Sequence, residues 1–565
     1  GMDGNLQFST VQSNRIAGYT PTGRIGIRTG RWTLTASGSG SFTPVAQSRF
    51  TETRGQAGQP LPFAGRSDSK SRTNYGRGHF SAVFDPTPKH TAGFDIEYTE
   101  RSTHMPTLSR TTLGQTQSDS RYRQHMGGNT LTATANYIWK IDTLGSQFKL
   151  IADYTRYTAH GDNSYHTTTC APGTLRDSLY ESATGSVYDI LTADAGLTRK
   201  LPHGLTLRAG LRYTRNGMAD DSRYAAQMQG TWQALPEYGY DQHYTEQIGA
   251  AYASLEYSAG RWELSAGLRG EYTSVASQAF GRSYFGLFPN VSVSRALNAL
   301  RTWLLVAQWS RNIERPAFPA LNPARIRISD YSWQSGNPSL RPTYIHRFSL
   351  TAVWKYRYTL TVGGNLHHDL IREIAHRDAT DPDAVYIRPE NHYTENHWFV
   401  AASVPAKITH WWNLSVNAVG VMQRIRLNST DSPATHYLMF ADATCSFTLP
   451  AGFFAEAAYR AQSRLYSGNS EVGPRHTLSA TVKKQFFGKR LTLFCTLSNI
   501  TGCDWEFASL TDGMRRTIDA RQAWSGRLWK AGAAWNFRAG KKFRARTVES
   551  AAETQRKRLV KSTEQ

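Results

Sequence analysis

The stretch 261-RWELSAGLRGEYT-273 decides the fold, because its apolar side chains recur at every second position. One set of alternate residues comprises Trp262, Leu264, Ala266, Leu268, Gly270 and Tyr272. The other set comprises Arg261, Glu263, Ser265, Gly267, Arg269, Glu271 and Thr273. A period of two is that of a β-strand, whose side chains point alternately to two faces. The stretch therefore predicts a strand with one apolar and one wet face.

The same alternation recurs along the chain, for example in Leu205–Thr214. The repeating segments exceed the ~5–6 residues of an ordinary globular strand, and they suit the ~9–11 residues that a tilted membrane strand needs. We place about 22 such strands, and an even number is typical of closed bacterial barrels. The sequence therefore predicts an all-β fold, a single closed antiparallel transmembrane β-barrel.

The connections between these strands fall into two alternating classes. Short turns are expected at 29–30, 85–88, 142–145, 201–202, 259–260, 296–299, 355–356, 407–409, 450–451 and 488–489. Long loops are expected at 44–77, 102–128, 159–186, 217–243, 314–344, 375–393 and 502–524, with shorter ones at 13–17, 276–284, 427–434 and 468–474. Short periplasmic turns and long extracellular loops are the outer-membrane pattern, and a soluble β-sandwich gives no reason for such asymmetry.

Tryptophan placement gives an independent indication. Of the 15 Trp residues, those close to the expected short turns are Trp32, Trp139, Trp262, Trp303, Trp354, Trp411 and Trp412. Amphipathic rings gathered at one end of the strands are typical of an interfacial aromatic girdle. The alternative, tryptophan in the core of a soluble β-protein, does not explain why these residues share one end.

Composition narrows the class further. The mean hydropathy of the 565 residues is -0.51, and no window holds the ~18 apolar residues of a membrane helix. The net charge of +22 is spread along the chain and accompanies no nucleic-acid motif, so we expect no nucleic-acid partner. The four cysteines lack metal-ligand spacing. A pair between Cys170 and Cys503 stays open, but unpaired thiols are favoured.

No constellation of catalytic residues stands out, so no enzyme, metal site or cofactor is expected. Adjacent His367 and His368 point to opposite faces of a strand and cannot share one ion. Residues 1–3 are interpreted as a cloning remnant or linker, residues 4–537 as the barrel, and residues 538–565 as a basic periplasmic tail. A signal peptide is not visible, and we expect that it was removed or lies outside this sequence.

The stretch 310–361, SRNIERPAFPALNPARIRISDYSWQSGNPSLRPTYIHRFSLTAVWKYRYTLT, resembles the signature of the outer-membrane-protein β-barrel family of Bacteroidetes, related to TonB-dependent receptors. The matching residues are Ser310, Arg311, Ile313, Arg315, Pro316, Leu321, Asn322, Pro323, Gly336, Asn337, Pro338, Leu340, Pro342 and Tyr344. Thr343 replaces the usual Glu, and LSNITG at 497–502 is also similar to the family.

The resemblance implies a 22-stranded barrel filled by an N-terminal plug domain and driven by the TonB complex. No plug segment or TonB box is visible before the first strand. The expectation is therefore a barrel portion of a longer receptor, or a gene truncated at its start, embedded in outer-membrane lipid and lipopolysaccharide.

Two groups of residues are candidates for the function. Arg208, Arg212, Arg269 and Glu271 are expected on the lumen face, where they either line a wet interior or contact a plug or an anionic solute. Arg325, Arg327, Tyr331 and Trp333 lie in an expected extracellular loop, where they either bind a ligand or pack the loop itself.

Uptake of a scarce nutrient is the leading hypothesis for function. A surface adhesin or structural envelope barrel is the alternative, and a passive porin is the third. The sequence names no substrate, because no motif reads a ligand.

Overall fold

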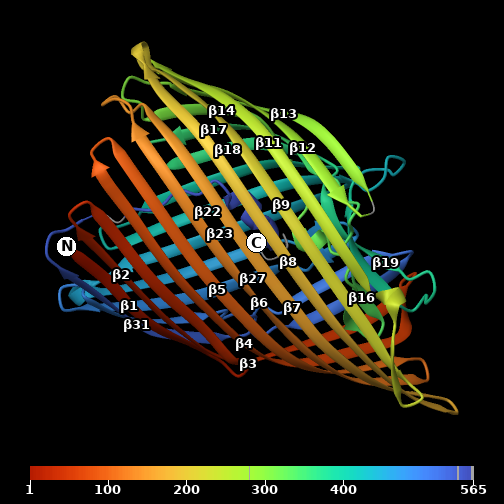
Figure 1. Cartoon of the computed structure of the whole chain (residues 1–565). Helices are drawn as coiled ribbons and strands as arrows, with labels where there is room; N and C mark the ends of the chain where they lie inside the picture. The colour runs from red at the N-terminus through yellow and green to blue at the C-terminus, as the bar shows by residue number, and fades with distance from the viewer. Residues whose placement is uncertain (279, 544–545, 561–565) are drawn as a thin grey trace.

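A computed structural model describes residues 1–278, 280–543 and 546–560, and it shows one closed antiparallel β-barrel (Figure 1). Within the described residues the wall has 22 strands, which confirms the predicted fold class. The first half of the wall comprises β1 (Met2–Gln12), β2 (Ile16–Thr29), β3 (Trp32–Gln56), β4 (Gln59–Thr87), β5 (His90–Leu113), β6 (Thr116–Lys140), β7 (Gln147–Ala171), β8 (Thr174–Leu201), β9 (Leu205–Met228), β11 (Tyr240–Ala259) and β12 (Trp262–Ser277).

The second half comprises β13 (Gly281–Ala296), β14 (Trp303–Glu314), β17 (Thr343–Trp354), β18 (Tyr358–His368), β21 (Thr394–Lys407), β22 (Trp412–Arg426), β23 (Ala434–Thr448), β24 (Phe453–Gln462), β27 (Arg475–Phe486), β28 (Leu491–Ser498) and β31 (Leu528–Ala539). The barrel closes where β31 pairs with β1, with Met2 opposite Ala539 and Gln12 opposite Trp529.

The two faces of the wall follow the alternation of the sequence. On β9, Leu207 and Leu211 are exposed on the outside, while Thr206 and Thr214 are buried on the inside. On β12, Tyr272 is likewise exposed. An apolar outer face and a polar inner face are what a barrel in lipid requires.

The ten expected short turns are all present at one rim of the barrel. The turn after β11 needs only Gly260 and Arg261, and Gly260 has a φ of +58°, a conformation that glycine adopts without steric cost. Six of the seven girdle tryptophans are exposed, at 39–45% of their surface, and Trp303 stacks on Trp354 with ring centroids 5.6 Å apart. The seventh, Trp412, is half-buried.

The opposite rim differs from the prediction, because three expected loops are tall β-hairpins. The segments 44–77, 102–128 and 159–186 continue the wall as paired strands, up to tight turns at 57–58, 114–115 and 172–173. The expected loop 217–243 is also largely strand. The inner face of these extensions is buried but largely polar, with residues such as Ser118, Ser120 and Thr167, so the apolar–polar alternation that marks a strand disappears from the sequence. Hydroxyl pairs such as Ser120 and Thr167, 2.9 Å apart, join the strands instead.

Shorter elements occupy the remaining loops. They are β10 (Thr231–Ala234), β15 (Ile326–Ser329), β16 (Ser332–Gln334), β19 (Ile371–Arg377), β20 (Val385–Asn391), β25 (Leu465–Ser467), β26 (Ser470–Val472), β29 (Trp505–Thr511), β30 (Met514–Arg521), α1 (Phe318–Leu321), α2 (Glu553–Arg556), η1 (Pro202–Gly204), η2 (Pro236–Tyr238), η3 (Pro450–Gly452) and η4 (Lys557–Leu559). Strands β15, β16, β20 and β19 form a second, small sheet in that order. None of the helices in the described ranges is long and apolar enough to span a membrane.

The C-terminal segment differs from the expected periplasmic tail. Residues 546–560, here called the tail, contact the inner wall of the barrel, where Arg546 bonds Asp85 and Arg558 bonds Glu246. The wall supplies acidic partners inside the lumen, and their attraction for the basic tail favours its position there. The sequence of the tail alone does not reveal these partners. All four cysteines are free, as favoured from their spacing.

Candidate functional site in the barrel lumen

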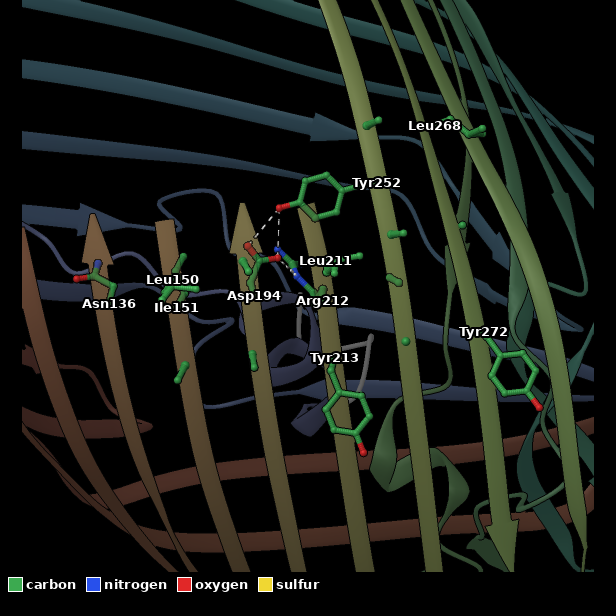
Figure 2. Close-up of a pocket in the computed structure, with 18 of the residues that line it drawn as sticks. Asn136, Leu150, Ile151, Asp194, Leu211, Arg212, Tyr213, Tyr252, Leu268 and Tyr272 are labelled. Atoms are coloured by element: carbon green, nitrogen blue, oxygen red, sulfur yellow. Dashed lines mark hydrogen bonds and ion pairs between the residues drawn. The ribbon is translucent and has the colours of Figure 1, made fainter. Parts of the chain in front are cut away.

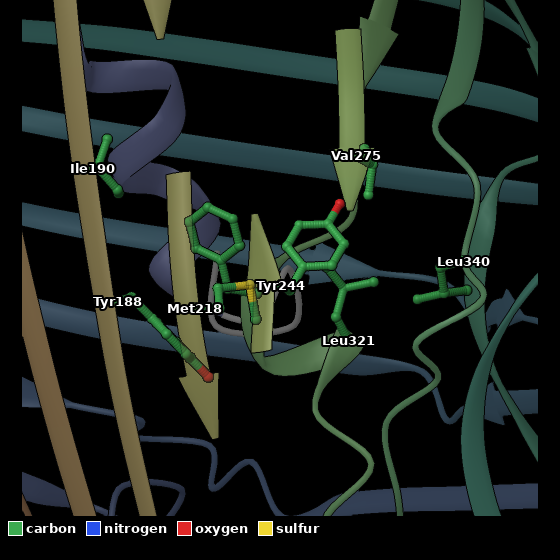
Figure 3. Packing of buried hydrophobic residues seen from close by; sticks show 8 residues of the cluster. Tyr188, Ile190, Met218, Tyr244, Val275, Leu321 and Leu340 are labelled. Atoms are coloured by element: carbon green, nitrogen blue, oxygen red, sulfur yellow. The ribbon is translucent and has the colours of Figure 1, made fainter. Parts of the chain in front are cut away.

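The lumen is partly filled by residues 315–342, here called the inner segment. Phe318, Leu321 and Leu340 of this segment are fully buried. They pack against the wall residues Tyr188, Ile190, Met218, Tyr244 and Val275, all of which are labelled in Figure 3. This cluster places an apolar core inside an otherwise polar barrel.

Polar contacts from the family-like motif fix the inner segment to the wall. Arg315 donates to Glu271 (2.7 Å) and to Thr273 (2.9 Å). Asn322 donates to Asp220 (3.1 Å) and accepts a hydrogen bond from the Tyr240 hydroxyl (2.6 Å). The motif residues therefore hold the chain inside the barrel.

A glycine of the same motif lets two parts of the inner segment touch. A Cβ added to Gly336 would lie 2.0 Å from the carbonyl oxygen of Asn322, so the close backbone approach requires glycine. Next to it, the backbone N–H of Asn337 donates to the carbonyl of Ala320 (2.7 Å), and the Asn337 side chain donates to Pro389 O (3.0 Å).

Charge balance keeps Arg315 ionised in this buried setting. Burial alone would lower its pKa, but Tyr284 and the negative charges of Glu271 and Glu246 outweigh burial and hold the pKa above its ordinary value. The side chain of Arg315 is 7% exposed, and its ion pair with Glu271 ties the inner segment to β12.

The candidate ligand residues Arg325, Arg327, Tyr331 and Trp333 all lie in the inner segment. Arg325 stacks its guanidinium on Trp333, 4.2 Å from the ring centroid, and Tyr331 meets Phe63 edge-on at 5.9 Å. Arg327 lies 5.7–5.8 Å from the ring centroids of Tyr122, Tyr165 and Tyr180, and 3.4 Å from Asp330. These side chains pack the loop and the wall; a role in ligand binding stays a prediction.

The candidate lumen residues are all in ion pairs. Arg208 pairs with Glu256, Arg212 with Asp194 (2.8 Å), and Arg269 with Glu271 (2.5 Å). Figure 2 shows Tyr252 and Arg212 converging on Asp194, and the tyrosine hydroxyl donates to that carboxylate at 3.2 Å. The first two pairs join neighbouring strands, whereas Arg269 and Glu271 both lie on β12, and each positive charge is neutralised in place. The surrounding pocket of about 1260 Å³ also includes Leu211, Leu268 and Tyr272 of the outer face, so we assign it to the lipid side.

The tail contacts the wall and the inner segment together. Arg558 donates to Glu246 (2.6 Å) and to the carbonyl of Pro316 (2.9 Å), and its guanidinium lies 4.3 Å from the Phe318 ring centroid. Lower in the lumen, Asp153 accepts hydrogen bonds from Ser550 (2.9 Å) and from the Ala551 N–H (2.7 Å). The tail therefore fastens the inner segment from the short-turn side.

A second buried charge cluster holds the small inner sheet. Glu52 of β3 accepts hydrogen bonds from Arg54 (2.9 Å) and Arg516 (2.8 Å), and Arg516 also donates to Ser332 of β16 (3.2 Å). Sequence reasoning missed Glu52, Asp153 and Glu246. For Asp153 and Glu246, an isolated acidic residue at an inward-facing strand position was a usable signal, whereas Glu52 lies in the segment 44–77 that was expected to be a loop.

A cavity of about 690 Å³ remains between the inner segment, β19, β29, β30 and the tail. Its lining combines apolar side chains with the charged Arg315, Arg372, Glu373, Arg516 and Lys557. Among the described residues, no group of three His, Cys, Asp or Glu side chains is placed to hold a metal ion. The mixture of apolar and charged side chains in the lining is compatible with a polar organic solute or a polypeptide surface.

Comparison with protein families identifies the chain. The model of the outer membrane protein beta-barrel family matches residues 139–529. The chain belongs to this family. It is accordingly an outer-membrane barrel, and neither this family nor the receptors it resembles are enzymes.

Solved structures show the same fold at low identity. The siderophore receptor PirA from Pseudomonas aeruginosa is 12% identical, with a TM-score of 0.57 over 95% of this chain and 80% of that one. A mutant of the ferric enterobactin receptor PfeA from the same species is 13% identical, with a TM-score of 0.60 over 95% and 80%. The alcaligin receptor FauA from Bordetella pertussis is 14% identical, with a TM-score of 0.52 over 95% and 76%. No curated protein matches the chain.

Proposed function

We propose that the chain is the barrel of an outer-membrane receptor that takes up a scarce nutrient with energy from TonB. The observation that carries the proposal is that charged residues of the inner wall form ion pairs around a lumen, and that this lumen is too wide for side chains to fill. About 8 strands already fill their own interior, whereas 22-stranded outer-membrane transporters hold a plug. The fold likeness to siderophore receptors over 95% of the chain supports the same function.

The inner wall would offer a plug domain a surface of neutralised ion pairs that can still form hydrogen bonds with it. Arg208, Arg212, Arg269 and Glu271 are the residues that we propose to face it. Because a barrel has no energy source of its own, the plug and the periplasmic TonB complex are required partners. Arg325, Arg327, Tyr331 and Trp333 are proposed to contribute to ligand binding from the inner segment. Outer-membrane lipid and lipopolysaccharide would surround the barrel.

A genetic test separates uptake from the other functions without knowledge of the substrate. The gene is deleted in cells with and without functional TonB, and accumulation of labelled iron chelates, cobalamins and oligosaccharides is measured. We expect accumulation of one solute to fall on deletion in TonB-positive cells, with no further fall in TonB-deficient cells. An equal fall in both backgrounds would indicate a passive porin. Loss of surface adhesion with unchanged accumulation would indicate the adhesin or structural function.

A further inference from the structure

The outer wall carries a basic groove of about 760 Å³ at the extracellular end of β3–β6. Six cationic residues line it, namely Arg15, Arg49, Lys70, Arg121, Arg123 and Arg521. Asp68 is the acidic residue of the lining. We propose that this groove binds the phosphorylated headgroup of an outer-leaflet glycolipid. The proposal rests on the outer-membrane location of the barrel and is independent of nutrient uptake.

Strand register shows that the charges share one face of the sheet. Arg49 lies directly opposite Arg521 of β30 on one side and Asp68 of β4 on the other. Asp68 lies opposite Leu108, which lies opposite Arg121. Residues directly opposite each other on antiparallel strands project from the same face, so these five form one row across the wall.

A second row runs beside the first. Gln47 lies opposite Lys70, and Pro106 lies opposite Arg123, two residues along β6 from Arg121. Leu108 is 61% exposed, whereas Tyr122, between the two arginines, is 4% exposed and faces the lumen. The groove therefore opens on the lipid side of the wall.

The groove begins where the membrane ends. Strand β1 has 11 residues, close to the ~9–11 that a membrane strand needs, and it ends at Gln12. The turn that follows it bonds to β3, because the Gln47 N–H donates to the Arg15 carbonyl (2.7 Å). Just below this level, exposed Phe8 and Tyr19 stack with ring centroids 6.4 Å apart. Aromatic residues at this depth mark the membrane boundary.

Part of the groove's charge is neutralised and part is free. Asp68 accepts from Arg49 (2.5 Å) and Arg66 (2.7 Å). Asp504 pairs with Arg15 (2.9 Å). Burial would raise the pKa of Asp504, but hydrogen bonds from Arg15 and Ser525 outweigh burial and hold the pKa below its ordinary value.

Lys70, Arg121 and Arg123, in contrast, form no ion pair with any residue that the structure describes. Exposed cations beside an apolar surface at the level of lipid headgroups suit a phosphorylated lipid, whose chains would lie along the aromatic wall below. Guanidinium groups bind phosphate oxygens with directional hydrogen bonds, which favours the two arginines as the main contacts.

The test compares two variants of equal charge. Arg121→Ala/Arg123→Ala removes two groove cations, and Arg176→Ala/Arg223→Ala removes two exposed arginines of the β8 and β9 extensions. The purified full chain is titrated with lipopolysaccharide, with the same lipopolysaccharide after removal of its phosphates, and with inorganic phosphate, and binding is read by native mass spectrometry. A change in migration on a denaturing gel between unheated and heated samples verifies that both variants are folded.

We expect the groove variant to bind lipopolysaccharide about 30-fold more weakly, since each Lys or Arg near an anionic membrane surface contributes about fivefold. The control variant should bind within about twofold of the parent chain. Equal binding of dephosphorylated lipopolysaccharide, or equal weakening in both variants, would overturn the proposal. Saturation by inorganic phosphate at concentrations that displace the lipid would identify a small-anion site instead and would also overturn it.

Discussion

Replacing Arg558 by alanine should release the tail from the lumen. Its partner Glu246 has a side chain that is 2% exposed, and Arg558 itself is 7% exposed. Removing one partner of a buried ion pair costs about 3–5 kcal/mol, because the other charge is left unpaired. Glu246 retains hydrogen bonds from Asn216 (2.9 Å) and Tyr244 (3.3 Å), so we expect the lower end of that range.

A loss of about 3 kcal/mol corresponds to about 150-fold in the equilibrium between the docked and the released tail, since 1.4 kcal/mol is tenfold. Hydrogen exchange of the backbone amides in 546–560 measures this equilibrium directly. We expect their protection to fall by about that factor in the Arg558→Ala variant. The inner segment should lose protection too, because Arg558 also bonds Pro316 and covers Phe318.

The neighbouring Lys557 provides a matched control. Its side chain is 62% exposed and pairs with Glu553, which is 72% exposed. A surface pair of this kind contributes ~0–1 kcal/mol, so Lys557→Ala should change protection by less than about fivefold. Adding Glu246→Gln to Arg558→Ala should restore part of the protection, because an amide is cheaper to bury unpaired than a carboxylate. Unchanged protection in Arg558→Ala, or no difference between it and the lysine control, would refute the reasoning.

Three further predictions concern packing, topology and the membrane face. Gly336→Ala places a methyl group against the carbonyl of Asn322 and should lower stability by ~1–3 kcal/mol, read as a lower temperature at which the folded gel mobility is lost; an unchanged temperature would contradict the backbone contact. Cys170 is exposed beside a hairpin tip and should react with an impermeant maleimide on intact cells, whereas the cysteine of a Thr409→Cys variant should react only after permeabilisation. The opposite pattern would show that the barrel has the inverse orientation in the membrane. Leu211 is 65% exposed on the lipid face, so Leu211→Arg should lower the free energy of unfolding by ~2–4 kcal/mol for a position near the bilayer midplane, measured in refolding titrations. An unchanged free energy would show that this face of β9 does not contact lipid.

The wall was predictable because the bilayer imposes a simple rule on it. A strand with lipid on one side and a wet lumen on the other must alternate, as Leu207 and Leu211 do against Thr206 and Thr214. Outside the bilayer this rule does not apply, and the strands there were not predicted. The hairpin extensions have no lipid on their outer face and bury polar residues such as Glu52 and Arg54 on their inner face, so residues 44–77 lack the alternation and were predicted as a loop although they pair as strands.

The contents of the lumen were less predictable, because they depend on contacts between distant parts of the chain. The motif around Arg315 and Gly336 was recognisable, but its position inside the barrel follows from contacts of Phe318 with Tyr188 and of Arg558 with Glu246. Which charged residues face the lumen could be predicted from the alternation of each strand. Which residues neutralise them could not be predicted, because Arg212 contacts Asp194 only once the register between β8 and β9 is set.

The seam between β1 and β31 has a consequence for the order of assembly. Every other pair of adjacent barrel strands joins neighbours along the chain, whereas seam partners such as Met2 and Ala539 lie at opposite ends of it. Distant partners meet slowly, because the chain entropy of a large loop must be lost before any contact forms. We therefore expect the seam to close last. The tail directly follows β31, and its partners Asp153 and Glu246 belong to strands that pair before closure. A tail docked on that open sheet would hold the last strand near the first and shorten the search that ends in a sealed barrel.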